Sequence, residues 1–132
     1  MQYIKLFIIF ISITLFSSCI RERRDIRGME KFEYLDTDRG YIFYKPDNLS
    51  ANAPLVFVLH GFGGNADWIK DYSRMNEIAD QNGFAVCYPQ GRRVGGNGDT
   101  HWNAGLSLST IDDVGFLSSL AQYLQSEHNL NP

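Results

Sequence analysis

The sequence is poor in cysteine and has no excess of basic charge. It contains only two cysteines, Cys19 and Cys87, so at most one internal disulfide can form and the fold must rely on its apolar core. Cys87 lies in the apolar run FAVCY, which favours a small buried side chain over a reactive thiol. The formal net charge is −3, and no basic stripe alternates with aromatic residues. We therefore expect no nucleic-acid partner.

The sequence also has no apolar run long enough to cross a membrane. The run from Leu6 to Phe16 is shorter than the roughly 20 residues of a spanning helix, but it has the length of a secretory signal core. The residues after it, LFSSC, resemble the lipobox of bacterial lipoproteins, which implies a lipid on Cys19. We expect residues 1–18 to be a lipoprotein-type signal peptide and the protein to lie in the bacterial cell envelope. The alternative is ordinary signal-peptide cleavage near Ser18, which would release a freely secreted protein.

The remaining chain divides into a tether, residues 19–30, and one α/β domain, residues 31–132. Two short segments with alternating apolar residues flank DTDRG and predict a β-hairpin. The apolar runs Leu55–Leu59 and Phe84–Tyr88 predict strands buried on both faces. Between them, a helix capped by Asp67 is expected to bury Trp68, Tyr72, Met75 and Ala79 and to end at Asn82-Gly83. Strand, helix and strand would form a parallel βαβ unit.

A last helix is predicted near the end of the printed sequence. Thr110 and Asp113 have the spacing of a capping box, and Asp112 and Asp113 place negative charge at the positive end of the helix dipole. Capping is therefore the preferred reading of both carboxylates over a catalytic one. The buried stripe of this helix is expected to be Val114, Leu117, Ala121 and Leu124.

Three glycines fall within four positions in VLHGFGGNADW. Gly61, Gly63 and Ala66 fit the dinucleotide pattern G-x-G-x-x-G/A, but that reading needs an acidic residue at the tip of the next strand. The tip reads YPQ instead, and Asp80 lies within the predicted helix. A P-loop is excluded because no Gly-Lys-Ser/Thr follows. The other use of such a loop is to direct backbone N–H groups at an oxygen that becomes negative during acyl transfer.

Several motifs occur in the order found in one family: GYIFYKP, PLVFVLHGFGGNADW, GFAVCYPQG, THWNAG and IDDVGFLSSL. From Tyr34 to Pro132 the chain resembles the secreted feruloyl-esterase and polyhydroxybutyrate-depolymerase-like group of α/β-hydrolases. The resemblance implies the N-terminal part of that fold, a carboxylic ester hydrolase with a serine nucleophile, a small or polymeric ester substrate, and no cofactor. Two departures are a missing cysteine pair at Leu106-Ser107 and YPQG in place of a YPDG-like turn.

The resemblance also implies roles for particular residues. The backbone N–H of Phe62 is the expected oxyanion donor, with that of Gly63 second. The side chains of Phe62 and Trp102 are expected to line the substrate cleft, although a structural aromatic pinning a loop is an equal reading of Trp102. His60 should brace the oxyanion turn, whereas His101 lies in a variable loop and His128 near a solvated helix end. His60 and His101 lack zinc-ligand spacing, so we expect no metal site.

The resemblance implies a catalytic triad in the order Ser, Asp, His, with the serine in G-x-S-x-G, but that motif does not occur in the sequence. We therefore expect a chain that is truncated before its nucleophile, with an incomplete sheet, and that is inactive alone. Two alternatives stay open. One is a fragment of a prolyl-oligopeptidase-type serine peptidase, which ester and peptide substrates would separate. The other is a non-catalytic binding protein.

Overall fold

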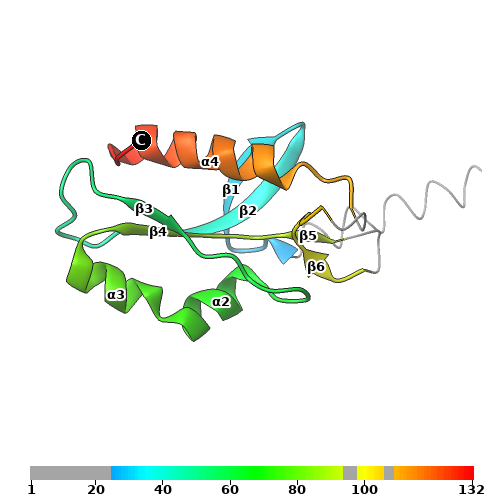
Figure 1. Cartoon of the computed structure of the whole chain (residues 1–132), viewed down its shortest axis with the longest axis horizontal. Helices are drawn as coiled ribbons and strands as arrows, with labels where there is room; N and C mark the ends of the chain where they lie inside the picture. Colours follow the sequence, from blue (N-terminus) through cyan, green and yellow to red (C-terminus); the bar gives the residue numbers. More distant parts are fainter. Residues whose placement is uncertain (1–24, 94–97, 106–108) are drawn as a thin grey trace, which may run out of the picture.

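The computed structural model describes residues 25–93, 98–105 and 109–132. They form a four-stranded mixed sheet in the order β1-β2-β4-β3, with helix α4 on one face and helices α2 and α3 on the other (Figure 1). A two-stranded sheet, β5 (Arg92–Arg93) with β6 (Thr100–His101), lies beyond the end of β4. This arrangement confirms an α/β fold. The predicted signal peptide, residues 1–18, and Cys19 lie outside the described residues.

The predicted hairpin is confirmed. Strand β1 (Glu30–Tyr34) pairs antiparallel with β2 (Thr37–Tyr44), and Tyr34 faces Thr37 across a two-residue turn. The turn residues Leu35 and Asp36 both have positive φ, 49° and 56°, as the hairpin turn that suits twisted strands requires. Strand β2 then pairs with β4 and joins the hairpin to the parallel part of the sheet.

The parallel βαβ unit is also confirmed. Strand β3 (Leu55–Phe57) pairs parallel with β4 (Ala85–Pro89), and every residue of β4 is buried. Cys87 packs on the α4 side of the sheet, while Val86 and Tyr88 pack on the α2 and α3 side. Strand β3, however, is shorter than expected. Within the described residues it is an edge strand with half-buried side chains, and Leu59 is 41% exposed.

The single helix expected after the glycines is two helices, α2 (Ala66–Ser73) and α3 (Met75–Asn82). Arg74, with a left-handed φ of 53°, separates them. The N-cap of α2 is Asn65, whose side chain accepts the Trp68 N–H at 2.8 Å, and not Asp67. Gly83, with φ 71°, ends α3 as predicted.

The buried face expected for this region was wrong in part. Trp68 and Tyr72 are 52% and 71% exposed and stack on each other, with ring centroids 4.7 Å apart. The fully buried residues are Ala66 and Ala79. These small side chains let both helices approach β4 closely, so the large aromatic rings are turned outward.

Helix α4 (Asp113–His128) begins two residues later than a capping box at Thr110 would place it, because Asp112 is the N-cap and accepts the Gly115 N–H at 2.9 Å. Its buried side chains are Phe116, Leu120 and Leu124, and Val114 is 74% exposed. The predicted buried face is therefore right for Leu124 and wrong for Val114, and its centre lies on Phe116 and Leu120. His128, expected to be solvated, is half-buried and stacks on Phe43 at 4.4 Å.

The structure describes residues 25–30 of the predicted tether, and Asp25 and Ile26 contact the domain. Ile26 is 6% exposed, and Asp25 forms an ion pair with Arg93. Ile26 lies so close to β2 that a Cβ at Gly40 would sit 2.5 Å from its Cγ2 atom. Among the residues described, no helix combines the length and the apolar character needed to span a bilayer.

The buried face of α4 gives a direct test. Leu120→Ala should lower the free energy of unfolding by about 2–5 kcal/mol, since it leaves a cavity under a fully buried side chain. Val114→Ala is the matched control and should change it by less than about 0.5 kcal/mol, because Val114 is exposed. Urea unfolding followed by circular dichroism measures both. Equal losses, or a larger loss for Val114→Ala, would restore the stripe predicted from the sequence.

Candidate active site

The imidazole of His60 holds the loop that follows β3. His60 is 2% exposed, and its Nε2 accepts the Gly91 N–H at 2.9 Å. Because Nε2 accepts, the proton lies on Nδ1, which donates to the Gly61 carbonyl at 2.8 Å. Burial lowers the pKa of His60 below its ordinary value, so the neutral ring is favoured. The ring therefore braces the glycine turn, as the sequence analysis expected.

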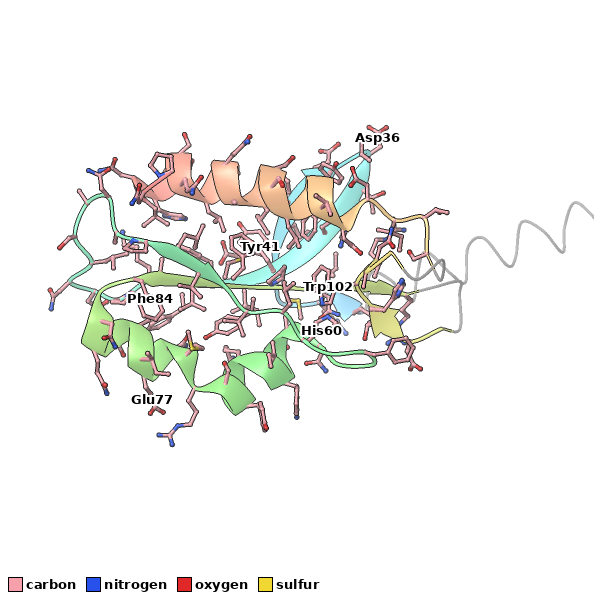
Figure 2. The ribbon with its side chains drawn as sticks, viewed as in Figure 1. Asp36, Tyr41, His60, Glu77, Phe84 and Trp102 are labelled. Atoms are coloured by element: carbon pink, nitrogen blue, oxygen red, sulfur yellow. The ribbon has the colours of Figure 1, made fainter. Side chains whose placement is uncertain are left out.

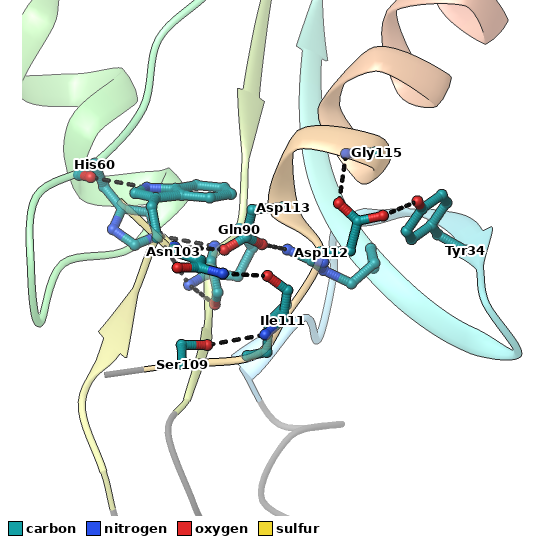
Figure 3. Close-up of polar contacts among 12 residues, drawn as sticks. Tyr34, His60, Gln90, Asn103, Ser109, Ile111, Asp112, Asp113 and Gly115 are labelled. Atoms are coloured by element: carbon teal, nitrogen blue, oxygen red, sulfur yellow. Dashed lines mark hydrogen bonds and ion pairs between the residues drawn. The ribbon is translucent and has the colours of Figure 1, made fainter. Parts of the chain in front are cut away.

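Gln90, at the end of β4, joins this loop to α2. Its Oε1 accepts the Ala66 N–H at 3.0 Å, at the first residue of the helix. Its Nε2 donates to the Gly91 carbonyl at 3.1 Å and lies 3.3 Å from His60 Nε2 (Figure 3). The glutamine of YPQG thus has a structural role that the sequence analysis missed. The position of Gln90 directly after a buried strand was the sequence feature that could have predicted this role.

The two predicted oxyanion donors differ in the structure. The Gly63 N–H donates to the Thr100 carbonyl at 2.8 Å, so it is already satisfied, and Gly63 itself has a φ of 73° that favours glycine. The Phe62 N–H has no hydrogen-bond partner within the described part of the chain. The roles of both amides as oxyanion donors stay predictions, and the Gly63 N–H would have to leave the Thr100 carbonyl to take that role.

Trp102 packs against the same loop. Its indole N–H donates to the His60 carbonyl at 3.0 Å, and the two rings lie 5.2 Å apart (Figure 2). A cavity of about 230 Å³ opens beside them, and its walls are largely apolar. The structure thus brings together Phe62 and Trp102, the two side chains predicted to line a substrate cleft. The cavity is lined by His60, Gly61, Phe62, His101, Trp102, Asn103, Ala104 and Ser109.

His101 is buried rather than part of an open loop. It lies in β6, is 3% exposed, and contributes to the cavity lining. Within residues 25–93, 98–105 and 109–132, neither ring nitrogen has a hydrogen-bond partner, which is uncommon for a buried polar group. The glycine-rich sequence around it gave no periodicity from which this burial could be predicted.

The two carboxylates at the start of α4 have different environments. Asp112 caps the helix and also accepts the Tyr34 hydroxyl at 2.6 Å, a hydrogen bond that holds the pKa of Asp112 below its usual range. Asp113 is 3% exposed and pairs with Arg39 Nη2 at 2.7 Å. The capping interpretation is confirmed for Asp112, whereas Asp113 is the partner of a buried cation. No group of three or more potential metal ligands occurs among the residues the structure describes.

Comparisons with known proteins agree with this arrangement. Residues 39–107, which hold the glycine loop and Trp102, match the family model described as esterase PHB depolymerase. The match covers more than half of the chain, and the chain belongs to this family.

Curated relatives carry esterase names. The chain is 28% identical over 88 residues to the bifunctional acetylxylan esterase/xylanase XynS20E of Neocallimastix patriciarum, covering 67% of this chain and 12% of that protein. It is 30% identical over 80 residues to feruloyl esterase B of Thermothelomyces thermophilus, covering 55% and 28%. It is 30% identical over 88 residues to acetylxylan esterase A of Talaromyces purpureogenus, covering 67% and 23%. The chain therefore spans little more than a quarter, at most, of these relatives.

The neutral His60 predicts a pH dependence of stability. Folding lowers the pKa of His60 from 6.5, so below that pH the unfolded chain binds more protons than the folded one. The His60 contribution is complete above that pH and is lost as the pH falls. We expect the free energy of unfolding to drop between about pH 7 and pH 5, and His60→Gln to flatten this slope. Urea unfolding at several pH values measures this pH dependence. An unchanged slope in the variant would contradict the assignment of a neutral His60 to the folded chain.

Proposed function

We propose that these residues form the oxyanion side of a carboxylic ester hydrolase that uses a serine nucleophile and has the α/β-hydrolase fold. The observation that carries the proposal is the Phe62 N–H, which has no hydrogen-bond partner among the described residues and lies in a loop bordering an apolar cavity. Free amides held in place before reaction stabilise a developing oxyanion at no further cost in reorganisation. The β1-β2-β4-β3 order and the position of the glycine loop after β3 support the fold assignment.

The proposed substrate is an ester with an apolar or aromatic group, as in feruloyl esterases or polyester depolymerases. Phe62 and Trp102 are assigned to substrate binding because both line the cavity. Phe62 is 71% exposed, so a ligand could cover a large apolar surface there. The names of the curated relatives, acetylxylan and feruloyl esterase, support an ester substrate.

The catalytic serine is not assigned to any printed residue, because the sequence contains no G-x-S-x-G. Removal of a triad serine costs about a millionfold in turnover even where binding and the oxyanion hole are intact. We therefore propose that these 132 residues alone are inactive and that a segment outside them supplies the nucleophile.

The test combines an activity assay with sequencing. The purified 132-residue chain should neither hydrolyse p-nitrophenyl butyrate nor react with a fluorophosphonate probe for activated serines. The DNA after the Pro132 codon should encode an in-frame G-x-S-x-G, and the corresponding longer product should do both. Serine-dependent hydrolysis by the 132-residue chain would overturn the proposed inactivity. A longer product that cleaves prolyl peptides and no esters would instead indicate a peptidase.

Export is proposed on the apolar run Leu6–Phe16, and the lipid anchor on the LFSSC motif at the end of that run. In cells expressing the protein, Cys19 should incorporate labelled palmitate and the chain should fractionate with membranes. Cys19→Ser should abolish both, because the acceptor thiol is gone. Cys87→Ser is the matched control and should leave labelling unchanged, since Cys87 is buried. A membrane-bound Cys19→Ser chain, or palmitate on Cys87, would contradict the anchor.

A further inference from the structure

A buried ion pair connects the sheet to the last helix. Arg39 lies on β2 and Asp113 is the first residue of α4; both side chains are almost fully buried, with exposures of 3% and 4%. Arg39 Nη2 donates to Asp113 Oδ1 at 2.7 Å, and its guanidinium carbon lies 3.8 Å from the centre of the Phe116 ring. Arg39 alternates with Tyr41 and Phe43 on the core side of β2, so the cation occupies a position where an apolar residue is expected.

The second oxygen of Asp113 is directed to a different element. Asp113 Oδ2 accepts the backbone N–H of Asn103 at 2.7 Å, and the Asn103 side chain donates to the Ile111 carbonyl at 2.9 Å (Figure 3). Asn103 directly follows Trp102, whose indole N–H is bonded to the His60 carbonyl. One continuous set of contacts thus runs from β2, through α4, to the wall of the cavity and the glycine loop.

Stability alone does not account for this arrangement. Burying two charges costs several kcal/mol, and apolar residues of similar size often hold two elements together equally well. An apolar residue at position 113 could pack α4 on β2 but could not accept the Asn103 amide. The carboxylate serves both partners, one with each oxygen. Its distinctive contribution is therefore to fix the segment that carries Trp102.

We propose that Arg39 and Asp113 are positioning residues that set the place of Trp102 against the oxyanion loop and so shape the cavity for an aromatic ligand. The assignment of the cavity to an aromatic ligand rests on the function proposed above. The positioning of Trp102 by Arg39 and Asp113 does not depend on that function. Arg39 orients the carboxylate, Asp113 holds the Asn103 backbone, and Trp102 is thereby held at its hydrogen bond to His60.

The indole N–H of Trp102 reports this position without any catalysis. The chain has two tryptophans, so a Trp68→Phe background leaves a single indole signal in a ¹H–¹⁵N spectrum. In that background the Trp102 signal should exchange slowly with water and should shift on titration with benzyl alcohol, an unreactive aromatic probe. The double variant R39M/D113L replaces the ion pair by apolar residues. We expect it to keep its far-UV circular dichroism, to exchange the Trp102 indole faster, and to bind benzyl alcohol about tenfold more weakly.

The matched control is Asp112→Asn, which removes the neighbouring carboxylate. Asp112 contacts Tyr34 and Gly115 but not the Trp102 segment, so the indole signal and its exchange should equal those of the parent. If R39M/D113L does not fold, Asp113→Asn, which keeps the shape and removes the charge, should also speed indole exchange. Parent-like exchange in a folded R39M/D113L or Asp113→Asn chain overturns the positioning role. No binding of benzyl alcohol to the parent overturns only the assignment of the cavity to aromatic ligands.

Discussion

The neutral imidazole of His60 is the constraint on which the candidate site depends. It bonds to the Gly61 carbonyl on its own loop and to the Gly91 amide beyond β4, so it joins the ends of two adjacent parallel strands. Gly91 must be a glycine, because a Cβ there would sit 2.6 Å from the His101 carbonyl. With the ring in place, Gln90 connects α2 and Trp102 closes over the His60 carbonyl. The bonds to Gly61 and Gly91 both require the same tautomer of this buried ring.

The sequence predicted the elements whose signals are local. The hairpin, the buried strand β4 and the end of α3 at Gly83 follow from alternation, a continuous apolar run and a residue suited to positive φ. The division between α2 and α3 was not predictable in this way, because Arg74 has no intrinsic preference for a left-handed conformation. The burial of Ala66 and Ala79 in place of Trp68 depends on how closely the helices approach β4. That distance is set by tertiary packing.

The same division applies to the site. The motif HGFGG predicted the glycine loop, but not that the Gly63 N–H donates to the carbonyl of Thr100, a residue of the distant strand β6. The neighbours of Asp113 in the sequence indicate a charge at the start of a helix. Its ion-pair partner Arg39 lies on β2, far away in the sequence, so the pair could not be predicted from local pattern. Arg39 occupies the same face of its strand as Tyr41 and Phe43. This placement of an arginine among core residues was the sequence feature that could have indicated a buried carboxylate partner. His101 had no such signal, and the two nitrogens of its ring stay without a partner among the described residues.

Cys87 sits at the middle of β4 with no exposed surface, and burial strongly raises the pKa of its thiol. A thiol in that state is protonated and inaccessible, so it does not react with alkylating reagents. Modification can proceed only when β4 separates from the residues packed over it, which requires the layers on that side to come apart. The rate at which a maleimide modifies Cys87 therefore reports how often β4 becomes exposed to solvent.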